Sequence, residues 1–106
     1  MRRASVYLRG TLVGELSEIS RNRFAFRYDD DYYYNASKPD LSLTITKKQQ
    51  EYRASFLFPA FYNILSEGES RKMQATLLGI DVEDDFGILL ATAQKDVAGG
   101  ITVKPL

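Results

Sequence analysis

The stretch from residue 57 to residue 79 constrains the fold more than any other part of this 106-residue sequence. Two apolar patterns of helical spacing meet there at a short polar turn. The first pattern places five large apolar residues at i, i+1, i+4, i+7 and i+8, namely Leu57, Phe58, Phe61, Ile64 and Leu65. In a helix of about 3.6 residues per turn these side chains lie along one side. We therefore predict a helix over residues 56–65 whose apolar side packs on a core.

A second helix is predicted to begin directly after the turn. Ser66 and Glu69 have the spacing of a capping box, in which the hydroxyl and the carboxylate each bind a backbone amide at the helix start. This predicts a helix over residues 67–78, closed by Gly79 in the left-handed conformation. Its buried face is expected to consist of three large apolar residues, Met73, Leu77 and Leu78.

Elsewhere, apolar residues alternate with polar ones, which predicts a sheet for the helices to cover. Strands are expected over residues 4–9, 12–19, 23–28, 41–46 and 101–104. The charged segment 47–51 reads as a loop. The polar and aromatic connection over residues 29–39 has room for one helical turn.

A third helix is predicted over residues 82–93. Asp81 and Asp84 supply its capping signal, and Gly87 inside it costs about 1 kcal/mol relative to alanine. Residues 96–100, with two consecutive glycines, are expected to end it. The elements together predict an α+β fold in a single domain of residues 1–106, with a mostly antiparallel five-stranded sheet or small barrel packed against about three helices.

The amino-acid composition limits the kinds of binding and catalysis that the chain can perform. Fourteen basic and fourteen acidic side chains cancel, so no overall field favours nucleic acid or acidic membranes. The sequence has no histidine and no cysteine, which removes Ser-His-Asp and Cys-His nucleophile systems and the usual zinc ligand sets. A signal-peptide core and a run of about 20 apolar residues are both absent. We expect a soluble, cytoplasmic protein that is not an enzyme, with no catalytic residue, cofactor or metal site.

Residues 85–87 spell Asp-Phe-Gly, the magnesium-binding tripeptide of protein kinases. Phosphoryl transfer also requires a glycine-rich loop, a strand lysine and a catalytic-loop aspartate, and these motifs are absent from the sequence. Phe86 instead falls on the apolar stripe of the third predicted helix. We therefore interpret the tripeptide as the start of that helix.

The third predicted strand has a basic face and an aromatic face. Arg21, Arg23 and Arg27 next to aromatic rings would suit single-stranded nucleic acid. The aromatic face is the one expected to be buried, however, which leaves the arginines without stacking partners. The tyrosine run at residues 32–34 is a candidate protein-binding surface, because tyrosine combines contact area with a polar group.

Several short segments, in this order and spacing, make the whole chain resemble the N-terminal subdomain of HipA-type serine/threonine kinase toxins. They are Val6-Tyr-Leu-Arg-Gly10, Val13-Gly-Glu-Leu16, Phe24-Ala-Phe-Arg-Tyr28, Leu41-Ser-Leu43, Phe61-Tyr-Asn-Ile-Leu65, Glu67-Gly68 with Arg71, Asp85-Phe86, Leu89-Leu90 and Asp96-Val-Ala-Gly99. Two departures are a serine at position 66, where the family usually has proline, and a glycine at position 100, where it usually has alanine.

The resemblance implies a function. In split HipBST-type systems a short protein equivalent to this subdomain, HipS, accompanies a kinase, HipT, and a helix-turn-helix protein, HipB. A chain of this length is similar to HipS, which implies an antitoxin that binds and inhibits a HipT-like kinase, with a HipB-like protein as a further partner. Two alternatives stay open: a non-catalytic subunit that completes or activates a split HipA-like kinase, and a small nucleic-acid-binding module.

The turn between the first two predicted helices is the expected docking surface. It is short and polar, and two packed helices would present it with little loss of loop entropy on binding. The partner-binding residues predicted there are Tyr62, Leu65, Ser66, Glu67, Gly68 and Arg71.

Overall fold

A five-stranded antiparallel sheet organises the chain in the computed structural model, which describes residues 1–94 and 100–106. Its strands, in the spatial order β4-β3-β2-β1-β5, are β1 (Arg2–Leu8), β2 (Thr11–Ser20), β3 (Arg23–Tyr28), β4 (Glu51–Ala54) and β5 (Ile101–Pro105). Four helices occur in the described residues: α1 (Asp30–Tyr33), α2 (Pro59–Tyr62), α3 (Gly68–Leu78) and α4 (Asp85–Thr92). The predicted α+β class and five-stranded antiparallel sheet are confirmed. The sheet is open, with β4 and β5 as its edges.

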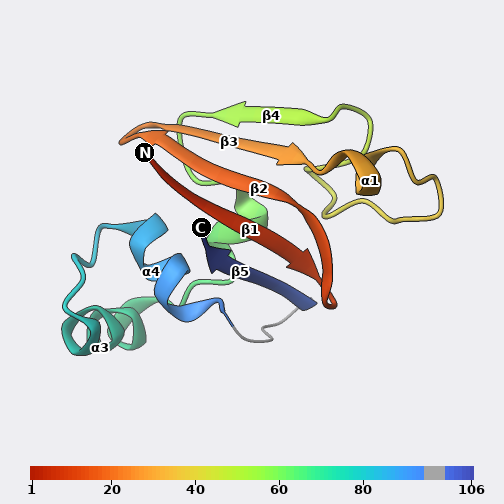
Figure 1. Cartoon of the computed structure of the whole chain (residues 1–106). Coiled ribbons are helices and arrows are strands. Elements are labelled where there is room, and N and C mark those ends of the chain that lie inside the picture. The colour runs from red at the N-terminus through yellow and green to blue at the C-terminus, as the bar shows by residue number, and fades with distance from the viewer. Residues whose placement is uncertain (95–99) are drawn as a thin grey trace.

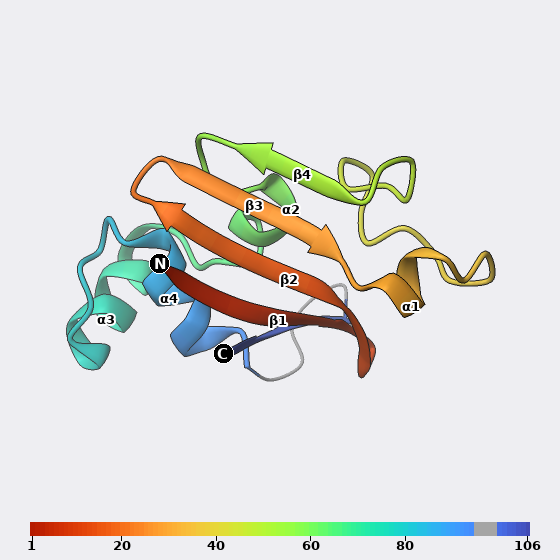
Figure 2. The same ribbon diagram turned by 45° about the horizontal axis from the view of Figure 1, so that its top comes forward.

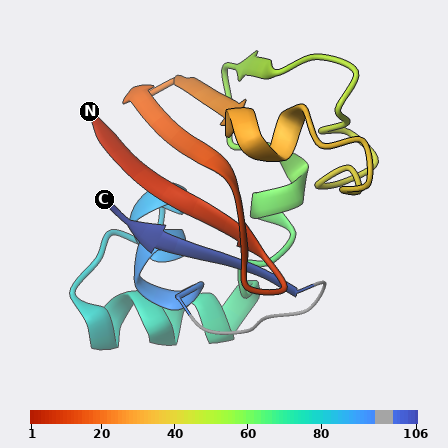
Figure 3. The same cartoon turned by 45° about the vertical axis from the view of Figure 1, so that its right-hand side comes forward.

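The helices lie at different distances from the sheet. Helices α2 and α4 lie against one face of the sheet, and α3 lies outside α4, farther from the strands (Figure 1, Figure 3). Helix α1 and the connection after it lie at the end of the sheet that is farther from α3 and α4 (Figure 2). The α2–α3 turn and the tyrosine run are therefore well separated surfaces. The two termini lie close together, and the Leu106 amide donates to the Arg3 carbonyl at 3.0 Å.

The face of the sheet that the helices cover is apolar and aromatic. Phe24, Phe26 and Tyr28 of β3 are buried, whereas Arg23 and Arg27 are exposed. The Phe26 ring meets Tyr28 edge-on at 5.1 Å and Phe61 of α2 at 6.0 Å, measured between centroids. The predicted burial of the aromatic face is confirmed, and these rings are not available to stack on nucleic-acid bases.

The predicted strand over residues 41–46 is wrong, because this segment is a turn held by side chains. The Ser42 hydroxyl accepts from the Ile45 amide at 3.0 Å, so a local bond replaces a strand ladder. Leu41 and Ile45 are buried, while Leu43 between them is 98% exposed. The alternation of apolar residues was therefore real in sequence but did not correspond to one face of a strand.

The fourth strand lies later, at β4, in and beyond the segment that was predicted to be a charged loop. It pairs with β3 through Phe26 opposite Tyr52 and Phe24 opposite Ala54. Tyr52 and Ala54 are half-buried, and Glu51 and Arg53 point to solvent. An edge strand tolerates charged residues on its outer face. Because two of the four residues of β4 are charged, the alternation of half-buried and exposed residues was not recognised in the sequence.

The first predicted helix, 56–65, is shorter than expected: α2 covers four residues. Phe58 precedes Pro59 and has ψ 142°, since a residue before proline is disfavoured in the helical region. The apolar stripe is nevertheless in the core, with Leu57, Phe58, Phe61 and Leu65 buried and Ile64 half-buried.

The second predicted helix is confirmed as α3, and so is Gly79 as its left-handed end, at φ 68°. Its predicted buried face is wrong. Met73 and Leu77 are 64% and 79% exposed, Leu78 is also exposed, and Ala75 is buried instead. The predicted capping box is not formed, because Glu67 occupies the N-cap position and Ser66 lies one residue before it.

The third predicted helix is confirmed as α4, although it begins at Asp85 rather than at residue 82. Its cap is Asp84, whose carboxylate accepts from the Gly87 amide at 3.1 Å, whereas the Asp81 carboxylate accepts from the Glu83 amide. Phe86 and Leu89 are buried, which confirms the helical interpretation of the Asp-Phe-Gly tripeptide. The break predicted at residues 96–100 lies mostly outside the described residues, and Gly100 has φ 76°.

The phenol of Tyr28 fixes the 41–45 turn to the core. It accepts from the Leu41 amide at 3.0 Å and donates to the Ile45 carbonyl. We expect Tyr28→Phe to lower the free energy of unfolding by about 1–3 kcal/mol, because two buried backbone groups lose their partner. Urea denaturation measures this loss, and Tyr34→Phe, at an exposed tyrosine, is the control.

The same substitution has a pH signature. Burial raises the pKa of Tyr28 to about 12 from 10.0. Above pH 10 the unfolded chain therefore loses this proton while the folded chain keeps it, and stability falls as the pH rises toward 12. Tyr28→Phe should reduce this alkaline loss. An equal loss in both proteins would contradict the role given to the Tyr28 phenol.

Over residues 1–94 and 100–106, no helix has the length and apolar content that crossing a bilayer requires.

Candidate partner-binding surface

The turn between α2 and α3 has an exposed centre between two anchored ends. Tyr62 is 43% exposed, and Glu67 and Gly68 are also exposed. Leu65 is buried before the turn and Ser66 is half-buried. Gly68 has φ 58°, a left-handed conformation that favours glycine. The structure therefore brings Tyr62, Glu67 and Gly68 to the surface at this end of the molecule, and it uses Leu65 for packing.

Arg71 anchors the other side of the turn. Its guanidinium donates twice to the Val82 carbonyl, from Nε at 2.9 Å and from Nη2 at 2.6 Å, and it also pairs with the Asp85 carboxylate. The side chain is 13% exposed. Arg71 was predicted to be an interface anchor, but the structure directs it inward, where it ties α3 to the segment before α4.

The tyrosine run at residues 32–34 also has a buried part and an exposed part. The Tyr32 ring is buried and stacks on Tyr28 at 5.9 Å, and its hydroxyl donates to the Pro39 carbonyl at 2.7 Å. Tyr33 is half-buried, and Tyr34 is exposed. As a protein-binding surface this run would therefore consist mainly of Tyr34.

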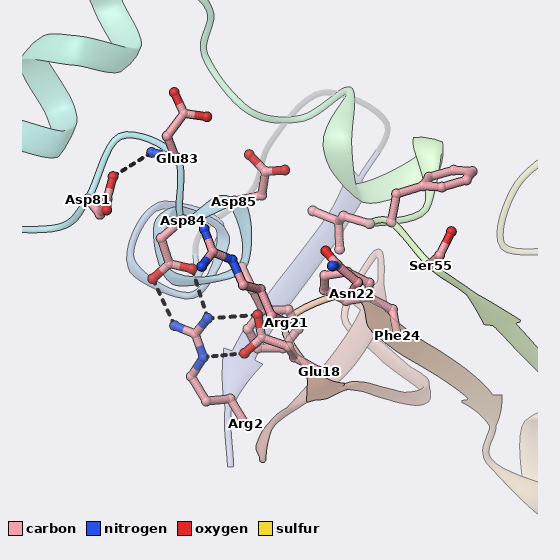
Figure 4. Close-up of a pocket in the computed structure, with 13 residues that line it drawn as sticks. Arg2, Glu18, Arg21, Asn22, Phe24, Ser55, Asp81, Glu83, Asp84 and Asp85 are labelled. Carbon is pink, nitrogen blue, oxygen red and sulfur yellow. Dashed lines mark hydrogen bonds and ion pairs between the residues drawn. The ribbon is translucent and has the colours of Figure 1, made fainter.

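A cavity of about 570 Å³ opens between the β2–β3 turn, the segment before α2 and the start of α4 (Figure 4). Its wall is an ion-pair cluster that sequence reasoning missed. Arg2 Nε and Nη2 bind Glu18 at 2.8 and 2.9 Å, and Nη1 and Nη2 bind Asp84 at 3.0 and 2.8 Å. The guanidinium carbon also lies 5.3 Å from the centre of the Phe86 ring. One arginine thus joins β1, β2 and the cap of α4.

The electrostatics of this cluster match its geometry. Hydrogen bonds from Arg2 hold the pKa of Asp84 below its usual range, and those to Asp84 and Glu18 raise the pKa of Arg2. Gly87 permits the arrangement, because a Cβ there would lie 2.2 Å from an Asp84 carboxylate oxygen. The Asp84 carboxylate is therefore committed to Arg2 and to the helix cap.

The carboxylates around the cavity do not converge on one point. Within residues 1–94 and 100–106, groups of three or more acidic, histidine or cysteine side chains that could hold a metal ion are absent. The cavity is an open, mixed-charge hollow stabilised by an internal cluster. The α2–α3 turn, with its exposed centre, stays the candidate surface for binding a partner.

Comparison with known proteins gives a consistent assignment. Residues 4–104 match the family model described as HipA N-terminal domain. A solved structure described as the N-terminal domain of HipA toxin superimposes with a TM-score of 0.75 at 27% identity, covering 100% of this chain and 93% of that one.

Two relatives come from Sinorhizobium fredii (strain NBRC 101917 / NGR234). Putative kinase Y4dM is 29% identical over 106 residues, and Putative kinase Y4mE is 26% identical over 101 residues. The matches cover 94% and 95% of this chain but only 26% and 24% of the relatives. The chain thus spans about a quarter of the length of each relative.

Proposed function

This chain belongs to the HipA N-terminal domain family, and from that membership we propose that it is an antitoxin-type binding protein that docks on and inhibits a HipT-like serine/threonine kinase. It acts without catalytic residues or a cofactor of its own. A HipB-like helix-turn-helix protein is the further partner in a tripartite toxin–antitoxin system.

One observation carries the proposal: the exposed centre of the α2–α3 turn is fixed on both sides. Leu65 is buried before it, and Arg71 is bonded to Val82 and Asp85 after it. Such a turn loses little conformational entropy on binding, so more of the contact energy contributes to affinity. The turn reaches toward the nucleotide site or glycine-rich loop of the kinase and prevents its productive closure.

The test is inhibition by turn variants. A purified HipT-like kinase that lacks this domain is assayed for phosphate transfer to a model substrate, with increasing amounts of the chain. Glu67→Lys and Tyr62→Ala each change an exposed side chain beside or within the turn. We expect each to raise the concentration that gives half inhibition by about tenfold or more, as loss of an interface hot spot does.

Two controls match these variants in chemistry. Glu51→Lys reverses an exposed charge on β4, and Tyr34→Ala truncates an exposed tyrosine beyond α1; both should inhibit like the parent. If the turn variants inhibit normally and Tyr34→Ala does not, the docking surface is the tyrosine run. If the parent chain increases phosphate transfer, the chain is an activating subunit.

A further inference from the structure

Helix α3 turns its large apolar side chains outward. Met73 and Leu77 are separated by four positions, so they lie on the same side of the helix one turn apart. Together with Glu69, Lys72 and Thr76 they line a shallow groove of about 340 Å³. We call these five residues the α3 outer face. Leu78 is also exposed but does not line this groove.

The inward side of the helix explains this orientation. Arg71 binds Val82 and Asp85, in the segment before α4 and at its start, and Ala75 is buried in the core cluster. Each residue of an α-helix is rotated by about 100° from the one before it, so Met73 and Leu77 lie about 200° from Ala75. A small residue and a tethered arginine thus attach the helix, and the stabilising contacts do not use Met73 or Leu77.

Two large apolar side chains exposed side by side lower the solubility of a protein. The packing of α3 does not require their exposure. Single exposed apolar residues are ordinary, whereas contiguous exposed apolar surface is typical of interaction sites in soluble proteins. Amphipathic helices bind partner grooves with anchors at i and i+4, which is the spacing of Met73 and Leu77.

We infer that the α3 outer face docks on the catalytic part of the kinase proposed above as partner, and this inference rests on that proposed function. The face is continuous with the α2–α3 turn, since α3 begins at Gly68 and Glu69 is the first residue of the face. From Glu69 to Leu77 it extends by about 12 Å along the helix. One partner surface can therefore contact both.

The relatives favour the kinase as the occupant. About three quarters of Putative kinase Y4dM and of Putative kinase Y4mE lie outside the region that matches this chain. A domain of this family is thus accompanied in its relatives by a much larger body of protein, against which an apolar helix face can be buried. In this arrangement the turn inhibits the kinase and the α3 outer face supplies affinity.

The test is a binding titration with the double variant Met73→Ser/Leu77→Ser against the purified kinase that lacks this domain. The control is Leu43→Ser, at a leucine that is 98% exposed in the 41–45 turn. We expect the double variant to raise Kd by about tenfold or more, mainly through faster dissociation. The control should keep the parent Kd. Because all three side chains are exposed, both proteins should unfold at the parent temperature.

The outcomes separate the two proposals. If the parent chain does not bind the kinase, the proposed function is wrong and this inference falls with it. If the parent binds and the double variant binds equally well, the docking on the kinase that the proposed function requires is supported and the inference is wrong. Loss of self-association with unchanged kinase binding would instead assign the α3 outer face to contact between copies of this chain, which also overturns the inference.

Discussion

Replacing Phe61 with alanine is expected to lower the free energy of unfolding by about 3–5 kcal/mol, the range for truncating a buried phenylalanine. Phe61 is fully buried and joins the helical layer to the sheet. Its ring packs 6.0 Å from Phe26 of β3 and 6.4 Å from Phe58, centroid to centroid. Urea denaturation followed by circular dichroism measures the loss. In a domain of this size such a loss is a large part of the total stability.

The matched control is Phe56→Ala, which removes the same side chain five residues earlier, where the ring is 62% exposed. We expect it to change the free energy of unfolding by no more than about 0.5 kcal/mol. Equal losses from the two substitutions would contradict the location of the core between α2 and β3.

Replacing Arg71 with alanine is the second large effect, with an expected loss of about 1.5–3 kcal/mol, the range for hydrogen bonds to charged groups. The substitution leaves the Val82 carbonyl and the Asp85 carboxylate without the guanidinium that binds them both. Arg71→Lys should restore only part of the loss, because an ammonium lacks the planar fork that donates to two acceptors. Chemical denaturation measures the three proteins side by side.

Hydrogen exchange locates the effect of Arg71→Ala. Amides of α3 should exchange faster, while those of β2 and β3 stay protected, since the helix is tied to the protein through this side chain. Lys72→Ala, at the neighbouring exposed lysine, should leave exchange unchanged. If Arg71→Ala leaves α3 as protected as in the parent, the arginine is available for a partner, as the sequence first indicated.

Much of the fold could be predicted because local patterns agreed with tertiary packing. The aromatic alternation of β3 predicted its buried face, and Gly79 predicted the end of α3. The prediction of a strand at residues 41–46 failed because the Ser42 hydroxyl and the Tyr28 phenol bind that backbone. Tyr28 is far from the segment in sequence, so the alternation alone could not reveal it.

The face of α3 shows a different limit of sequence reasoning. Spacing identified Met73 and Leu77 as one side of a helix, which is correct. Periodicity does not say whether an apolar side meets its own core or a partner, and here Arg71 determines the orientation from the opposite side. The available signal was Arg71, which lies on the same side of the helix as the small residue Ala75.

The candidate site was only partly predictable. The exposed turn at Glu67 and Gly68 follows from the end of one helical pattern and the start of the next. The cluster of Arg2, Glu18 and Asp84 does not, because Arg2 and Asp84 are 82 positions apart and no local spacing links them. Such a contact follows only from the tertiary fold, in which β5 pairs with β1 and also contacts α4.

The most direct test of the central claim is the phosphate-transfer rate of a purified HipT-like kinase that lacks this domain, measured against the molar ratio of added chain. Inhibition by direct docking predicts that the rate falls to a small fraction of its starting value near an equimolar ratio. It also predicts that Glu67→Lys shifts this fall to higher ratios. A rate that stays constant or rises across the whole titration, with a chain shown to be folded, would contradict the account.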